Sequence, residues 1–266
     1  QPWPVGRQAQ RAAQPEGGAP VAPCAIQAEG DAYTPNGPAP FSMPRALALH
    51  EIPVVIEQFR QGAARAKMAG FDGVEIHGAN GYLPDQFLQD GTNHRTDEYG
   101  GPIENRARFL LDVTQAAIDV WGADRVGVRL SPSGTYGSMS DSNPQETFGY
   151  VAEKLDEMGI AYLHVVEPRI KGTELVAESD AVAARYLRGA FSGTLIAAGG
   201  FDGASAEAII RAGDADAVAF GRAFISNPDL PERLRRNLPL NAYDRSTFYG
   251  GDAHGYTDYP ALESVG

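Results

Sequence analysis

The chain has 266 residues, of which 43% are hydrophobic and 21% charged, so it holds enough apolar material for a packed core and is not disordered in composition. Its 22 basic and 34 acidic side chains give a net charge of −12, which opposes binding to nucleic acid or to an anionic membrane surface. A single cysteine excludes an intramolecular disulfide and a multi-cysteine metal site, and no apolar run approaches the ~18 residues of a membrane span, so we expect a soluble, cytoplasmic protein.

The first fifty residues are rich in proline and glycine, which excludes a long helix. They also contain Ile26, Tyr33 and Phe41, so they are too apolar for a disordered linker. We therefore expect residues 8–50 to form a long ordered loop, and loops of such length are usually functional.

After Ala46 the sequence alternates between helical and strand patterns. Apolar residues recur at helical spacing from Ile52 to Ala66, with Gly70 as a stop signal, and again from Ile103 to Trp121. Further helices are predicted at 145–158, 179–190, 203–212 and near 228–237. Strands are predicted at 73–77, 126–130, 160–166, 194–198 and 215–220. Because these strands are nearly continuous in apolar residues, they are expected to be parallel, buried on both faces and joined by right-handed crossovers, which defines an α/β protein.

Polar residues and glycines stand at the carboxyl end of nearly every predicted strand, namely His77, Arg129, Glu167 with Arg169, Gly199 with Gly200, and Gly221 with Arg222. In a TIM (β/α)8-type barrel that rim is the active face. A doubly wound sheet would begin with a glycine-rich nucleotide turn after its first strand, and none is present. We therefore predict one barrel domain over residues 1–266. The basic cluster Arg233, Arg235 and Arg236 is interpreted as a solvated helix face.

The segment from His77 to Tyr82 follows the strand 73–77. His77 and Asn80 can each donate a hydrogen bond, so together they can hold a carbonyl oxygen and stabilise the negative charge that develops when its conjugated double bond is reduced. Tyr82 is near enough to deliver a proton, because a phenol is a plausible acid toward a carbanion-like carbon. The alternative is that His77 and Asn80 only bond the loop backbone. No metal is predicted, since the loop has no second ligand at metal spacing.

Glycines follow the last two predicted strands, as Gly199-Gly200-Phe201 and Phe220-Gly221-Arg222. Glycine lets the backbone approach an anion closely, and helix N-termini present N–H groups with a partial positive charge. We predict a phosphate site there, which numbers these strands as the seventh and eighth of a barrel. The alternative is that the glycines only make tight turns.

Arg129 ends the strand 126–130 and is expected to point into the barrel mouth. An arginine there needs an anionic or aromatic partner. It either binds the edge of a cofactor ring or pairs with a carboxylate such as Glu75, and the sequence does not choose between the two.

Several stretches together resemble one family, the Old Yellow Enzyme group of flavin-dependent ene-reductases. The resemblance is carried, in chain order, by Trp3-Pro4-Val5-Gly6-Arg7, Glu75-Ile76-His77-Gly78-Ala79-Asn80-Gly81-Tyr82, Asp85-Gln86-Phe87-Leu88, Asn93-His94-Arg95, Asp97-Glu98-Tyr99-Gly100-Gly101, Glu104-Asn105-Arg106, Val128-Arg129-Leu130-Ser131-Pro132 and Phe220-Gly221-Arg222. It spans essentially the whole chain, and the order and spacing of the strings make it specific.

The resemblance implies a barrel that binds FMN non-covalently and is reduced by NADPH or NADH. It further implies that hydride passes from flavin N5 to the β-carbon of an α,β-unsaturated carbonyl or nitro compound. By position, His77 and Asn80 match the pair that binds the substrate oxygen, and Tyr82 the residue that protonates the α-carbon. The implied FMN ligands are Gln1, Arg129, Gly199, Gly200, Gly221 and Arg222, and the implied pocket-lining aromatics are Trp3 and Tyr249.

The chain departs from the family pattern in two ways. Pro2 and Pro4 flank Trp3 and disfavour a central strand there, and Pro84 stands where an aliphatic residue is usual. The family's N-terminal portion, which holds the first two barrel strands, is absent from the sequence. We therefore expect strands three to eight of the barrel, with the third near Trp3.

Two other functions compete with the ene-reductase. One is a truncated or degenerate family member that acts as a non-enzymatic folded module. The other is a flavin-free isomerase or lyase that binds a sugar phosphate, with Glu75 or Glu167 as its base. The natural substrate, the choice of NADPH or NADH and the formation of a homo-oligomer stay open.

Overall fold

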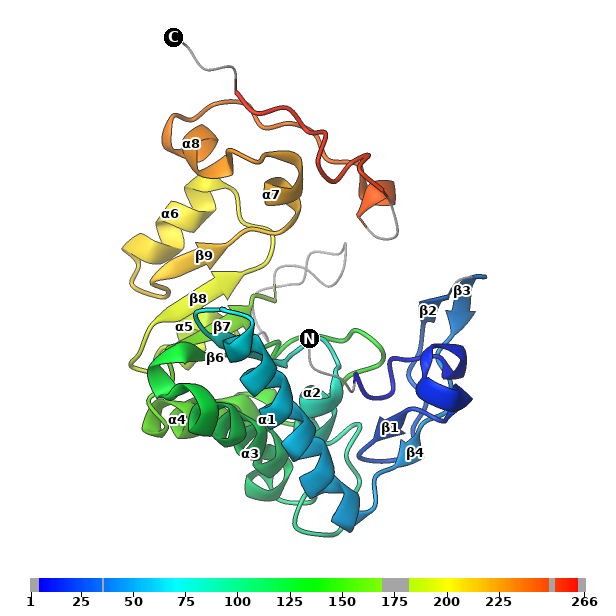
Figure 1. Ribbon diagram of the computed structural model, residues 1–266. Helices are drawn as coiled ribbons and strands as arrows, with labels where there is room; N and C mark the ends of the chain where they lie inside the picture. The colour runs from blue at the N-terminus through cyan, green and yellow to red at the C-terminus, as the bar shows by residue number, and fades with distance from the viewer. Residues whose placement is uncertain (1–4, 35, 169–181, 249–251, 263–266) are drawn as a thin grey trace.

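The computed structural model describes residues 5–34, 36–168, 182–248 and 252–262. Its centre is a parallel five-stranded sheet in the order β5-β6-β7-β8-β9 (Figure 1). The strands are β5 (Val74–Gly78), β6 (Val126–Leu130), β7 (Tyr162–Val166), β8 (Leu195–Ala198) and β9 (Ala217–Ala219). Each begins and ends within two residues of its predicted bounds. The sequential strand order with helical connections is that of part of an α/β barrel.

Two long helices cover the β5 side of the sheet. Helix α1 (Ile52–Met68) buries Ile52, Val55, Phe59 and Ala63 and is followed by Gly70, whose φ is +84°. Helix α3 (Ile103–Trp121) has the predicted bounds and ends at Gly122, whose φ is +85°. Glycine adopts this left-handed conformation without steric cost, which explains why both helices stop where they do.

The remaining helices are α2 (Leu83–Leu88), α4 (Pro144–Glu157), α5 (Ala184–Leu187), α6 (Gly203–Arg211), α7 (Arg222–Ser226) and α8 (Leu230–Arg235). The sequence did not predict α2 or α7. The predicted helix 179–190 is represented by α5, while residues 169–181 lie outside the described part of the chain. No helix among the described residues is both long and apolar enough to span a bilayer.

The basic cluster on α8 corrects one expectation. Arg235 and Arg236 are exposed, as expected, but the side chain of Arg233 is only 7% exposed and pairs with Asp229. Its guanidinium also donates to the carbonyl oxygens of Pro239 and Pro260. Arg233 therefore anchors the C-terminal segment instead of forming a solvated face.

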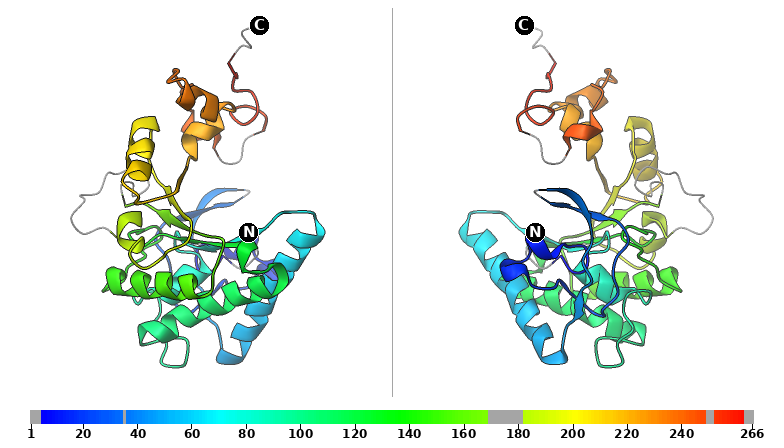
Figure 2. Two further views of the ribbon diagram at one scale, coloured as in Figure 1. Left: turned by 90° about the vertical axis from the view of Figure 1, so that its left-hand side faces the viewer. Right: turned by 90° about the vertical axis from the view of Figure 1, so that its right-hand side faces the viewer.

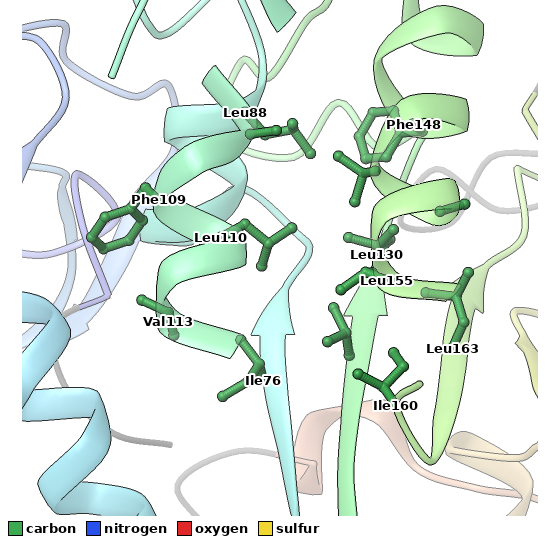
Figure 3. Packing of buried hydrophobic residues seen from close by; sticks show 14 of the residues in the cluster. Ile76, Leu88, Phe109, Leu110, Val113, Leu130, Phe148, Leu155, Ile160 and Leu163 are labelled. Carbon is green, nitrogen blue, oxygen red and sulfur yellow. The ribbon is translucent and has the colours of Figure 1, made fainter. Parts of the chain in front are cut away.

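The main core lies between the sheet and its helices. Alternate strand residues face this side, among them Ile76, Leu130 and Leu163, and they meet Leu110 and Val113 of α3 and Leu155 of α4 (Figure 3). Phe109 and Phe87 stack with ring centroids 4.3 Å apart. Burying each of these large side chains contributes about 1.5–3 kcal/mol.

The opposite face of the sheet differs from the prediction of strands buried on both faces. It carries Glu75 and His77 of β5, Arg129 of β6 and His164 of β7, all half-buried or more exposed. The physical reason is that the five described strands form an open sheet, so only the helix-covered face is sealed from water. The open face therefore holds polar side chains, and those of His77 and Arg129 lie near the carboxyl ends of their strands.

The described residues before α1 form an ordered segment beside α1 and α2 (Figures 1 and 2). This segment contains two small sheets, β1 (Val21–Ala22) parallel to β4 (Arg45–Ala46) and β2 (Asp31–Thr34) antiparallel to β3 (Gly37–Pro40). Its described helices are 3-10 turns of three residues, in keeping with the predicted absence of a long helix. Arg7 is 1% exposed and donates to the carbonyl oxygen of Gly137 at 2.6 Å, which fixes the segment to the loop after β6.

Candidate active site

Strand β5 delivers His77 to the open face of the sheet, and the loop that follows brings Tyr82 back against it. The two rings meet edge to face with centroids 4.9 Å apart and planes at 79°. The loop reverses through Asn80 and Gly81, whose φ angles are +55° and +74°. This left-handed pair of residues is the reason that positions five apart in the sequence come into contact.

His77 is held in one neutral form. Its pKa is lowered from 6.5 to about 4. Burial is the main cause, and the positive charge of Arg129 is the second. Its Nδ1 accepts a hydrogen bond from the backbone N–H of Ala79 at 3.3 Å, so the ring proton belongs on Nε2. His77 is therefore able to donate a hydrogen bond from Nε2 while uncharged.

The backbone of Asn80 is held from two sides. Its N–H donates to the hydroxyl of Ser131 at 2.7 Å, and its carbonyl oxygen accepts from the amide of Gln8 at 2.8 Å. Within the described part of the chain its side-chain amide forms no hydrogen bond. The backbone contacts fix the residue and leave the amide available to a ligand.

One row of side chains crosses the open face of the sheet. In the strand register His77 of β5 is paired with Arg129 of β6, and Arg129 is paired with His164 of β7. Paired residues of neighbouring strands point to the same face, so these three side chains stand side by side. The row runs from the His77 loop to β7, the middle strand of the sheet.

The guanidinium of Arg129 has a buried N–H that no described residue accepts. Its Nε is buried and has no hydrogen-bond partner in the described structure. The carboxylate of Glu75 lies instead 3.0 Å from His164 Nδ1. The expected alternative of an Arg129–Glu75 ion pair is therefore not formed among the described residues. A buried donor without a partner costs about 1–3 kcal/mol, so an acceptor at this place stabilises the site.

A cavity of about 560 Å³ opens beside Arg129, within the ~300–1,000 Å³ range of ligand pockets. Its lining brings together every described residue predicted to bind the cofactor, that is, Arg129, Gly199, Gly200, Gly221 and Arg222. No atom lies within 4 Å of the place where a Cβ on Gly221 would stand, so protein packing does not demand glycine there. Open space at Gly221 and the unused donor of Arg129 fit an aromatic cofactor that carries a phosphate, such as FMN.

The structure adds residues to this site that the sequence did not single out. His164 lines the cavity and has an unpartnered, buried Nε2. Its signal in the sequence was the alternation of Tyr162, His164 and Val166 on one strand face. Tyr243 also lines the cavity, and the guanidinium carbon of Arg222 lies 5.9 Å from the centre of its ring.

The remaining predicted site residues lie outside the described residues or have another structural role. Gln1, Trp3 and Tyr249 lie outside the described residues, so their predicted roles stay predictions. Glu167 is 7% exposed and accepts from the backbone N–H of Ala184 at the start of α5. This contact makes Glu167 a helix-capping group, which weighs against its use as the base of an isomerase.

Comparison with known proteins places the whole chain in one family. Residues 1–241 match the model of the NADH:flavin oxidoreductase / NADH oxidase family. The chain is 49% identical to putative 12-oxophytodienoate reductase 11 of Oryza sativa subsp. japonica, over 98% of this chain and 72% of that relative. It is 47% identical to 12-oxophytodienoate reductase 2 of Arabidopsis thaliana, over 99% of this chain and 71% of that relative.

Solved structures show the same fold. Morphinone reductase matches with a TM-score of 0.92 and 49% identity, over 98% of this chain and 71% of its own. The Old Yellow Enzyme homologue from Zymomonas mobilis matches with a TM-score of 0.93 and 42% identity, over 98% of this chain and 72% of its own. The resemblance seen in the motifs and the predicted barrel-type α/β fold are thus confirmed. This chain belongs to the NADH:flavin oxidoreductase / NADH oxidase family, the FMN-dependent oxidoreductases of the Old Yellow Enzyme type.

Proposed function

We propose that this chain is an ene-reductase that uses NADPH or NADH to reduce the activated C=C bond of α,β-unsaturated carbonyl or nitro compounds. Its relatives include reductases named for 12-oxophytodienoate and morphinone, which supports a small organic substrate. When bound, FMN supplies the hydride chemistry, accepting a hydride from NAD(P)H and delivering one to the β-carbon of the alkene.

The observation that carries the proposal is the pairing of His77 with Arg129 on adjacent strands. Arg129 lines the cofactor-sized cavity, and His77 stands next to it with a free Nε2–H. A substrate oxygen bound by His77 is therefore held beside the cofactor site. Arg129 would hold the negatively polarised edge of the flavin ring, while Gly199, Gly200, Gly221 and Arg222 would hold its phosphate.

His77 and Asn80 bind and polarise the substrate oxygen. As the β-carbon gains hydride, negative charge develops on that oxygen, and two donors aimed at it stabilise the charge. A neutral imidazole suits this role because it donates a hydrogen bond without giving up its proton. Removing one such donor typically slows a reaction about 10²–10³-fold.

Tyr82 supplies the proton that completes the reaction. Its ring contacts that of His77 edge to face, so its hydroxyl and the oxygen-binding group are carried by the same loop. The proton passes from the phenol to the α-carbon, and solvent restores it afterwards. General acid catalysis of this kind contributes about 10²–10⁴-fold.

Steady-state kinetics on the FMN-loaded chain test the proposal. The expected result is cyclohexenone-dependent oxidation of NADPH or NADH with cyclohexanone as the product. A chain that stays colourless after incubation with FMN would exclude the proposal. A yellow chain that fails to consume cyclohexenone would favour the competing hypothesis of a non-enzymatic module.

A further inference from the structure

A buried carboxylate stands behind the His77–Tyr82 loop. Asp85 lies on α2 and is 0% exposed, and both of its carboxylate oxygens accept hydrogen bonds. Its Oδ2 accepts from the backbone N–H of Gly81 at 2.8 Å and from the hydroxyl of Ser131 at 3.4 Å, and its Oδ1 accepts from the amide of Gln89 at 2.7 Å. The carboxylate therefore connects α2 to the loop that carries the proposed catalytic groups.

Ser131 relays this contact to Asn80. It is 1% exposed, directly follows β6, and accepts from the backbone N–H of Asn80 at 2.7 Å while it donates to Asp85. A chain of hydrogen bonds thus runs from Asn80 N–H through the Ser131 hydroxyl to the Asp85 carboxylate and back to Gly81 N–H. It holds both residues at which the loop reverses direction, and their positive φ angles need such support.

We propose that Asp85 and Ser131 are positioning residues, which set the placement of the Asn80 amide and the Tyr82 hydroxyl without touching the substrate. The inference rests on the proposed function, because it assigns the loop to substrate binding. Beyond that function, the placement of Asn80 in the oxygen-binding pair depends on Asp85 of α2 and on Ser131, which follows β6.

Burial and hydrogen bonding act on the Asp85 carboxylate in opposite directions. Burial raises its pKa to about 7, although the hydrogen bonds from Gln89, Gly81 and Ser131 favour the charged form. The charged groups that act on it are Asp141, which raises its pKa further, and Arg7, which is attracted to it. The three donors offset part of the cost of burying this carboxylate, as buried polar groups require.

The test compares Ser131→Ala with Ser133→Ala. Ser133 lies on the same loop, but its hydroxyl bonds the backbone of Val182 and not the His77 segment, so it is a matched control. Amide hydrogen exchange, read at single residues in the FMN-free chain, is expected to accelerate about two- to tenfold at Asn80 in Ser131→Ala and to stay unchanged in Ser133→Ala. This measurement needs no catalysis.

Kinetics on the FMN-loaded chain then separate positioning from general stability. Ser131→Ala is expected to raise KM for cyclohexenone about two- to tenfold while the Kd for FMN stays unchanged. Asp85→Leu is expected to have a larger effect. Asp85→Asn is expected to restore most of the affinity, because its amide keeps one acceptor for Gly81 and can donate to a rotated Gln89 amide.

Two results would overturn the inference. One is exchange at Asn80 that is the same in Ser131→Ala and the unsubstituted chain. The other is faster exchange with no change in KM. Absence of turnover in the unsubstituted chain is a failure of the proposed function instead, and the exchange measurement then decides whether Ser131 holds the loop.

Discussion

His77 and Arg129 occupy paired positions on β5 and β6, so a neutral imidazole stands beside a buried guanidinium. Arg129 helps to keep His77 uncharged, and the row that they begin places a hydrogen-bond donor next to the cofactor-sized cavity.

The protonation of His77 is directly measurable. Burial and Arg129 lower its pKa to about 4, so the side chain is neutral from pH 8 down to about pH 5. An NMR titration of the FMN-free chain, with His77→Ala to identify the signal, should give a midpoint near pH 4. Between about pH 6.5 and 4 the unfolded chain binds more protons at this position, so His77 makes the folded chain less stable as the pH falls through that window. A midpoint near the ordinary 6.5 would contradict this account.

Tyr82→Phe removes the proposed proton donor and keeps the ring that contacts His77. The oxidation of reduced FMN by cyclohexenone is expected to slow about 10²–10⁴-fold, because general acid catalysis is lost. Reduction of FMN by NADPH needs no proton from Tyr82 and should keep its rate. Stopped-flow absorbance follows both steps separately, and equal slowing of the two would rule out the assigned role.

Gly81→Ala is expected to distort the loop, since a Cβ there would lie 2.2 Å from Gln8 Nε2 and 2.9 Å from the carbonyl oxygen of Tyr136. Gly213→Ala is the matched control, because Gly213 has a similar φ of +76° and no atom within 4 Å of the added Cβ. The control should lose roughly 1 kcal/mol of stability from backbone strain alone. Denaturant unfolding should show a larger loss for Gly81→Ala, together with a higher KM. Equal losses at the two positions would show that the close contacts are harmless.

The buried Arg233 is expected to hold the C-terminal segment on α8. Arg233→Met removes the pair with Asp229 and the hydrogen bonds to Pro239 and Pro260, at a cost of about 1.5–3 kcal/mol. Arg235→Met is the control on the same helix, because the Arg235 side chain is 75% exposed and its loss should cost less than about 0.5 kcal/mol. Limited proteolysis should release the segment after α8 faster only in Arg233→Met. Similar cleavage of both variants would argue against the anchor.

The fold was predictable where apolar periodicity decides it. Helix α3 has its predicted bounds because apolar residues recur at helical spacing and Gly122 ends them. Helix α2 was missed because it has only six residues and buries Asp85 and Gln86, so its position depends on partners distant in the sequence. The hairpin β2–β3 was missed as well, although Asn36-Gly37 is a dipeptide typical of tight turns.

The sequence indicated which residues belong to the site but not which of them contact one another. His77 and Arg129 were identified because each ends a strand, and their adjacency follows from the strand register, which the sequence does not state. The contact of Ser131 with Asn80 joins residues 51 positions apart and leaves no local pattern. Arg233 was misread for the same reason, since its burial comes from a segment that returns to α8 after residue 239.

A single-turnover experiment shows whether the flavin bound to this chain passes its hydride to an activated alkene. The FMN-loaded chain is reduced with one equivalent of NADPH in the absence of oxygen and then mixed with cyclohexenone. We expect the visible flavin band to return and an equal amount of cyclohexanone to form. A flavin that stays bleached, with the cyclohexenone unchanged, would contradict the proposed function.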